Sequence, residues 1–257
     1  MITNMLEAIG RSAIGALERC GRFAIFAMQT MSALTKRPNR KHITVQMERI
    51  GVNSLPIVLL TALFTGMVLS IQIAHEFIRY GAQSTIGGIV AIAMCRELAP
   101  VLTGVVVAGR VGASITAELG SMRVTEQIDA LRVMGTNPVR YLVVPRLWSG
   151  MFMLPILVLF ADAVGTMGGY LIATAYFDIS GFTFINSIQT YTTIHDFLGG
   201  MVKSIVFGAI VAMIGCYRGM YCANGAEGVG RATTESVVTS IILIFMTNCI
   251  MSAIWFR

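Results

Sequence analysis

The sequence predicts an all-α polytopic membrane protein with five transmembrane helices, preceded by an amphipathic interfacial helix. The chain of 257 residues is 55% hydrophobic, and its mean hydropathy is +0.74. Only 12% of its residues are charged, whereas a soluble domain has about 25%, so there is too little charge to cover a water-facing surface. Five apolar stretches are also long enough to cross a bilayer, which needs about 20 residues.

Residues 1–50 form an N-terminal region that we expect on the cytoplasmic side of the membrane. The segment 14–34 is moderately apolar but contains Glu18, Arg19 and Arg22. No small-residue cleavage site follows it, which argues against a cleaved signal peptide. The pattern favours an amphipathic helix in the interface, with its basic residues toward the headgroups. A sixth span is the alternative.

The rest of the chain, 51–257, is predicted to be one membrane domain, with spans at 53–74, 84–110, 147–172, 198–217 and 236–256. The helical pattern of the second span continues to Leu119. Pro100 is expected to kink that helix because its ring removes one backbone hydrogen bond. Small residues at every fourth position permit close helix contact, either within one chain or between two copies; they are Ala108, Gly112, Thr116, Gly120, Gly165 and Gly169.

The distribution of lysine and arginine predicts how the chain lies in the membrane. Five basic residues lie between 36 and 49, directly before the first span, four lie in the connector 118–146, and the loop 173–197 has none. Basic loops stay in the cytoplasm. We therefore expect a cytoplasmic N-terminus and a C-terminus on the opposite side.

The connector between the second and third spans contains a predicted short helix at about 125–135. Thr125 is expected to cap it, with Glu126 at the positive end of the helix dipole. Ile128, Leu131 and Met134 recur every three residues on one face, while Gln127, Asp129 and Arg132 lie elsewhere, and Gly135 with Asn137-Pro138 ends the helix. Two interpretations are open. The helix either rests on lipid headgroups or is a rigid lever presented to a cytoplasmic partner.

Cofactor and nucleotide chemistry are not indicated by any motif. The five cysteines include no C-x-x-C pair, and the three histidines lie far apart. The run GGMVKS at 199–204 has Val202 where a P-loop needs glycine before the lysine. We therefore expect this chain to bind no cofactor and to be no enzyme, so that any ATP and magnesium would be bound by a partner subunit. The net charge of +6 reflects cytoplasmic loops rather than a nucleic-acid surface.

Arg96 and Glu97 are adjacent charges inside the otherwise apolar second span. If Arg110 marks the cytoplasmic interface, Glu97 lies 13 residues, or about 20 Å, further out, in the outer half of the membrane. Neither residue has an opposite charge at i±3 or i±4. Their partner must come from another helix, another subunit or a ligand. The alternatives are a salt bridge that fixes the fold and a cavity where arginine would bind a headgroup phosphate.

Three further patterns complete the intramembrane prediction. Leu69, Ile73 and Phe77 form a stripe on the first span, which indicates either helix packing or an apolar pocket wall, and Tyr80 follows one turn later. Asp162 and Lys203 are expected to pair across helices. Arg110, Ser114 and Glu118 share one face near the inner interface, as snorkelling or packing groups.

One long segment resembles a known family signature. The run ELAPVLTGVVVAGRVGASITAELGSMRVTEQIDALRVMGTNP at 97–138 closely resembles the signature of the MlaE family of ABC transporter permeases, with further matches at GMVLSIQ (66–72), VPRLWSG (144–150) and GRATTESVV (230–238). The likeness covers most of the chain and is weakest in the first 40 residues. It implies that 125–135 is the coupling helix, which would contact an ATPase through Glu126, Ile128, Asp129, Leu131, Arg132, Met134 and Gly135.

The resemblance also implies partners and a substrate. The partners would be a second copy of the chain, a cytoplasmic ATPase pair, a periplasmic hexamer of MCE proteins and a small cytoplasmic accessory subunit. The substrate would be phospholipid, moved at the bacterial inner membrane to maintain outer-membrane lipid asymmetry. Glu97, Leu69 and Tyr80 match lipid-pocket positions of the family, and Arg96, Ile73 and Phe77 are added here as their neighbours.

Two other functions are weighed against this one. An ion-driven secondary lipid carrier would need no ATPase and should show repeat symmetry and broken helices. A lipid-modifying enzyme would need a nucleophile and base, or a histidine–carboxylate cluster, near an interface. Neither pattern is found in the sequence.

Overall fold

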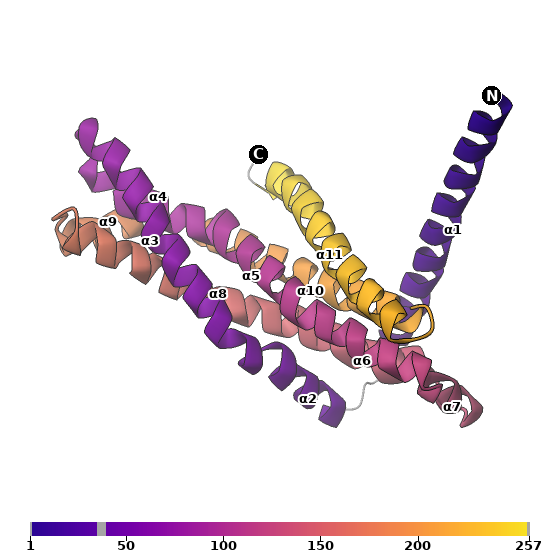
Figure 1. Cartoon of the computed structure of the whole chain (residues 1–257). Helices are drawn as coiled ribbons and strands as arrows, with labels where there is room; N and C mark the ends of the chain where they lie inside the picture. Colours follow the sequence, from indigo (N-terminus) through magenta and orange to yellow (C-terminus); the bar gives the residue numbers. More distant parts are fainter. Residues whose placement is uncertain (1, 35–39, 256–257) are drawn as a thin grey trace.

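A computed structural model of the chain describes residues 2–34 and 40–255, and within them it contains helices and short connectors but no strand. Figure 1 shows the arrangement. The α-helices are α1 (Ile2–Leu34), α2 (Arg40–Ile50), α3 (Leu55–Arg79), α4 (Ile86–Ala93), α5 (Ala99–Val107), α6 (Ala113–Val124), α7 (Gln127–Val133), α8 (Val144–Ala175), α9 (Gly181–Tyr191), α10 (Ile194–Met220) and α11 (Ala226–Trp255). Short 3₁₀ segments η1 (Val52–Ser54) and η2 (Gln83–Thr85) and π-helical segments η3 (Met94–Leu98), η4 (Ala108–Gly112) and η5 (Val139–Val143) join them.

Five helical segments are long and apolar enough to cross a membrane, as predicted. They are Lys41–Arg79, Gln83–Val124, Val139–Ala175, Ile194–Met220 and Ala226–Trp255. Each contains nearly all of one predicted span and most extend beyond both of its ends. The second has 42 residues and is therefore about 63 Å long, twice the thickness of the hydrocarbon core (about 30 Å). It must project beyond the membrane.

The second span changes its winding instead of running as one α-helix. The π-helical segment η3 lies directly before Pro100, and η4 follows α5. Proline at position 100 cannot donate a hydrogen bond to the carbonyl four residues earlier, and the chain widens to a π-turn just ahead of it. Such π-segments occur often at functional sites, and η3 contains both Arg96 and Glu97.

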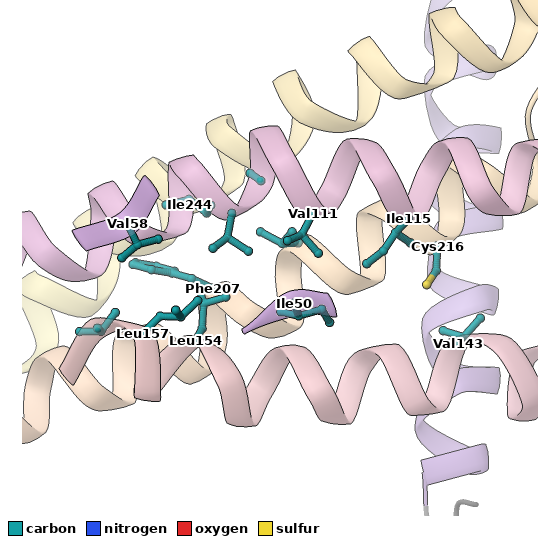
Figure 2. Packing of buried hydrophobic residues seen from close by; sticks show 14 of the residues in the cluster. Ile50, Val58, Val111, Ile115, Val143, Leu154, Leu157, Phe207, Cys216 and Ile244 are labelled. Atoms are coloured by element: carbon teal, nitrogen blue, oxygen red, sulfur yellow. The ribbon is translucent and has the colours of Figure 1, made fainter. Parts of the chain in front are cut away.

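Glycines allow the central helices to pack closely. A Cβ atom on Gly66 of α3 would lie 1.8 Å from the carbonyl oxygen of Gly165 in α8, and one on Gly208 of α10 would lie 2.3 Å from that of Gly150. Ser70 Oγ also donates a hydrogen bond of 2.9 Å to the Gly169 carbonyl. The small-residue pattern at 165 and 169 therefore serves packing within one chain. Around these crossings lies an apolar core that includes Val58, Val111, Leu154, Leu157, Phe207 and Ile244 (Figure 2).

Helix α1 leaves the bundle at the end where α6 meets α11 (Figure 1). Its contact with the bundle is aromatic. The ring of Phe26 is buried and lies 5.6 Å from that of Tyr217, and Phe23 lies 5.2 Å from the same tyrosine. Several of its other apolar side chains, such as Met28 and Met31, are exposed. A position in the membrane interface remains a prediction.

The connector helix is present but begins differently from the prediction. Helix α7 spans Gln127–Val133, and its N-cap is Glu126 in the left-handed conformation with φ 59°. The predicted cap by Thr125 is wrong, because its hydroxyl donates back to the Ser121 carbonyl at 2.9 Å and so closes α6. The predicted stop is confirmed: Gly135 has φ +73°, a conformation in which glycine carries no steric penalty.

A helix that the sequence analysis did not predict lies in the loop 173–197. Helix α9 packs against α4, where a Cβ on Gly87 would lie 2.3 Å from the Phe184 carbonyl oxygen. The Gly88 amide donates a hydrogen bond of 2.9 Å to Ser187 Oγ. Figure 1 places α9 at the end of the bundle opposite α7.

Candidate functional site: an ionic network within the spans

Glu97 is the centre of a polar network between three spans. Its Oε1 accepts hydrogen bonds from Lys203 Nζ at 2.8 Å and Ser252 Oγ at 2.7 Å. Its Oε2 accepts one from Asn248 Nδ2 at 2.8 Å. Lys203 belongs to α10, and Ser252 and Asn248 belong to α11. Both carboxylate oxygens are therefore held, yet the Glu97 side chain is still 39% exposed.

Lys203 is the buried cation of this network. Its side chain is 1% exposed, and Nζ donates to Glu97 Oε1, Ser252 Oγ and the Arg96 carbonyl, each at 2.8 Å. The predicted pair of Lys203 with Asp162 is wrong. Asp162 instead lines an apolar cavity beside Cys95, and its Oδ1 has no hydrogen-bond partner among the described residues.

Local sequence explains why the Arg96 carbonyl can accept this bond. In an α-helix it would accept from the amide four residues later, but that residue is Pro100, which has none. Gly200 completes the arrangement, because a Cβ there would lie 2.2 Å from the Cys95 carbonyl oxygen. A glycine one turn before Lys203 thus lets the α10 backbone approach η3.

Arg96 has a separate partner on α10. Its Nε donates to Asp196 Oδ1 at 2.7 Å, and Nη2 lies 2.6 Å from the same oxygen. Asp196 is buried and also accepts from the amide and hydroxyl of Thr193, which forms a capping box at the start of α10. The Arg96 side chain remains 38% exposed. Both adjacent charges are therefore joined to α10 by ion pairs.

The remaining candidates for a lipid pocket lie along α3. Leu69, Ile73 and Phe77 are half-buried and pack against a cluster formed by Ile86, Phe184 and other residues of α3, α4, α8 and α9 and the α8–α9 connector. Tyr80, at the C-cap of α3, is 82% exposed and is not part of that cluster. The stripe therefore contributes to packing, and its contact with lipid stays a prediction.

The connector between the second and third spans contains a cluster of ion pairs around Asp129 and an exposed apolar residue, Met134, at its end. Asp129 accepts hydrogen bonds from Arg123 Nη1 at 2.5 Å and Arg132 Nη1 at 2.8 Å, which ties α7 to α6. Ile128 is buried, and Leu131 packs half-buried on the core. Met134 was predicted on the same face, but it is 70% exposed, because α7 ends at Val133 and the chain turns away.

Asn248, Ser252 and Asp196 were not singled out from the sequence. Asn248 and Ser252 are polar residues four positions apart in the last span, a spacing that places both on one helix face. Thr193 and Asp196 have the T-x-x-D spacing of a capping box. Both signals are readable in the chain, but neither identifies its partner on the second span.

Five segments long and apolar enough to cross a membrane, with ion pairs between them, indicate an integral membrane protein. The family model for Permease MlaE matches residues 43–254, and the chain belongs to that family.

Curated relatives agree with this assignment. A probable ABC transporter permease protein of Rickettsia bellii is 42% identical over 258 residues, which cover the whole of both chains. One of Synechocystis is 48% identical over 224 residues, 87% of this chain and 85% of the relative. The chloroplastic protein trigalactosyldiacylglycerol 1 of Arabidopsis thaliana is 42% identical over 212 residues, 82% of this chain and 61% of the relative.

Proposed function

We propose that this permease moves phospholipids between the bacterial inner membrane and a periplasmic carrier of the MCE type, and so maintains outer-membrane lipid asymmetry. The observation that carries the proposal is the exposure of Arg96 and Glu97. Each side chain is nearly two-fifths exposed, although the orientation predicted from the basic loops would put both in the outer half of an otherwise apolar span. A phospholipid headgroup brings matching charges to that depth.

The chemistry of the network suits a headgroup that stays bound only for a time. Arginine binds phosphate through paired hydrogen bonds, and a glutamate accepts from an ammonium or hydroxyl group. Asp196 and Lys203 balance the charges of Arg96 and Glu97, so the four side chains together carry no net charge. Leu69, Ile73, Phe77 and Tyr80 would line the path of the acyl chains. The Arabidopsis relative carries the name of a glycerolipid, trigalactosyldiacylglycerol, which supports a lipid substrate.

The exposed tip of the connector supports a separate ATPase subunit as the engine. Val133 and Met134 are 89% and 70% exposed, and an apolar pair at a cytoplasmic tip is typical of a protein contact. The polar side chains around that contact would be those of Glu126, Asp129 and Arg132. Ile128 and Leu131 would hold the connector helix against the rest of the chain, and Gly135 would end it. ATP and magnesium would be bound by the ATPase, as the names of the relatives as ABC transporter permeases support.

The complete transporter would contain two copies of this chain, an ATPase pair, a periplasmic MCE hexamer and a small cytoplasmic accessory subunit. The N-terminus would lie in the cytoplasm and the C-terminus in the periplasm. In this arrangement, headgroups would reach the Glu97 network either from the membrane or from the periplasmic MCE protein.

Reconstitution tests the proposal. The purified complex is placed in vesicles with fluorescent phospholipid, and transfer to the soluble MCE domain is followed with and without ATP. Transfer should need ATP and should fall about tenfold, equivalent to about 1.4 kcal/mol, in Glu97→Gln. Glu76→Gln removes an exposed carboxylate near the outer end of α3 and should transfer normally. Equal rates in the two variants, or ATP-independent transfer, would contradict the proposal.

A further inference from the structure

A polar cavity lies near the predicted cytoplasmic end of the bundle, away from the Glu97 network. It has a volume of about 260 Å³ and is lined by Gln46, Arg49, Ile50, Asn53, Arg110, Val111, Ser114, Ile115 and Glu118. These residues come from α2, η1, η4 and α6, so the cavity lies between the start of the first span and the inner half of the second. Figure 1 places α2 and α6 toward the end that carries α7.

The charge around this cavity is positive. Glu118 is the only acidic residue among the nine that line it, and both its oxygens are occupied. Oε1 lies 3.2 Å from Arg49 Nη1, and Oε2 lies 2.9 Å from the buried Arg146 Nη2. The lining therefore has two arginines, at 49 and 110, against one carboxylate, a formal charge of +1, and that carboxylate is also paired with Arg146 outside the lining.

Arg110 is held in place before any ligand arrives. Its Nη1 donates a hydrogen bond of 2.7 Å to Ser54 Oγ, and Ser54 is fully buried. The residue sits in the π-helical segment η4, as Arg96 sits in η3. A guanidinium anchored through one nitrogen and lining a cavity is pre-organised for an anion, since little side-chain entropy is lost on binding.

The other lining groups suit an amphiphile. Gln46, Asn53 and Ser114 can donate hydrogen bonds to anionic oxygens. Ile50, Val111 and Ile115 also line the cavity and are part of the apolar core. Basic pockets between transmembrane helices on the cytoplasmic side are suited to lipid headgroups.

We propose that this cavity binds a phosphate group, that of a phospholipid in the inner leaflet. Arg110 and Arg49 would bind its oxygens, and Ser114 and Asn53 would complete the hydrogen bonding. The site lies about 20 Å along the second span from Glu97, so one headgroup cannot occupy both. Binding of a phospholipid in this cavity does not depend on the proposed function. Only the further step, that the bound phospholipid is also transported, rests on it.

Binding to the purified permease, without ATPase or MCE protein, tests the site. Thermal stability is measured in uncharged detergent while dihexanoyl phosphatidylglycerol or inorganic phosphate is titrated. The short-chain lipid should stabilise the wild type, and Arg110→Gln should raise its apparent Kd about tenfold. Arg231→Gln removes an 82% exposed cytoplasmic arginine and is the matched control. Ser114→Tyr fills the cavity while keeping both arginines, and should also weaken binding.

The outcomes separate the possible sources of the phosphate. An unchanged Kd in both Arg110→Gln and Ser114→Tyr would overturn the proposal. Equal stabilisation by inorganic phosphate and by the lipid would overturn the assignment to phospholipid and leave a site for free phosphate. Glu97→Gln should keep the wild-type response. If Glu97→Gln abolishes transfer but not this binding, the two sites are distinct; if it abolishes both, this proposal fails.

Discussion

Lys203 is almost completely buried, yet it is charged and lies in an apolar span. It makes three hydrogen bonds of 2.8 Å, to Glu97, Ser252 and the Arg96 carbonyl. A buried charge that loses its counter-ion is strongly destabilising. The pair therefore joins the second and fourth spans and, through Ser252, the fifth. Glu97 therefore has a structural role, and the proposed ligand-binding role is compatible with it, because the carboxylate is held and still partly exposed.

Replacing Lys203 and Glu97 singly and together should show how strongly they stabilise each other. Lys203→Met should destabilise the protein by about 2 kcal/mol, since Glu97 loses its cation, and should lower the Tm in detergent by about 6 °C. Glu97→Gln should also destabilise, because the buried ammonium then lacks a counter-ion. The double variant should be more stable than the sum of the single effects predicts. Additive effects in the thermal melts would show that the two residues do not stabilise each other.

At the scale of the element, η3 and α10 are matched to each other. Pro100 has no amide hydrogen, so the Arg96 carbonyl in η3 lacks its usual donor, and α10 supplies one from Lys203. Gly200 allows the two backbones to come close enough. Pro100 on the second span and Gly200 on α10 are therefore both needed for the contact between Lys203 and the Arg96 carbonyl.

Gly200→Ala should break that contact. The new methyl group would lie 2.2 Å from a backbone carbonyl, so α10 must move away, at a cost of about 2 kcal/mol, and the Lys203 contacts would lengthen. Gly109→Ala is the control, since no atom lies within 4 Å of its Cβ position. We expect a lower Tm and weaker lipid transfer for Gly200→Ala only. A normal Tm for Gly200→Ala would contradict the close approach.

At the scale of the whole molecule, polar groups lie at two depths. The Glu97 network lies toward the end of the bundle with α9. The cavity lined by Arg49 and Arg110, here called the arginine cavity, lies toward the end with α7. The same spans connect them, because Gln83–Val124 contains both Glu97 and Arg110. Their order along the membrane normal depends on the orientation that the basic loops predict.

Fusion reporters test that orientation. A reporter active only in the cytoplasm should be silent at the C-terminus. One inserted at Asn224 in the α10–α11 connector should be active, because Arg218 and Arg231 flank that connector. The reverse pattern would invert the molecule and place the arginine cavity in the outer leaflet.

The sequence by itself determined the number of spans, the position of the connector helix and the end of that helix at Gly135. These features depend on local composition and backbone preference, which are readable along the chain. Only the tertiary structure decided the partners of the charges: Lys203 pairs with Glu97 and not with Asp162, and Arg96 pairs with Asp196. Such choices depend on which helix faces come together, and that information is absent from the periodicity of any single helix.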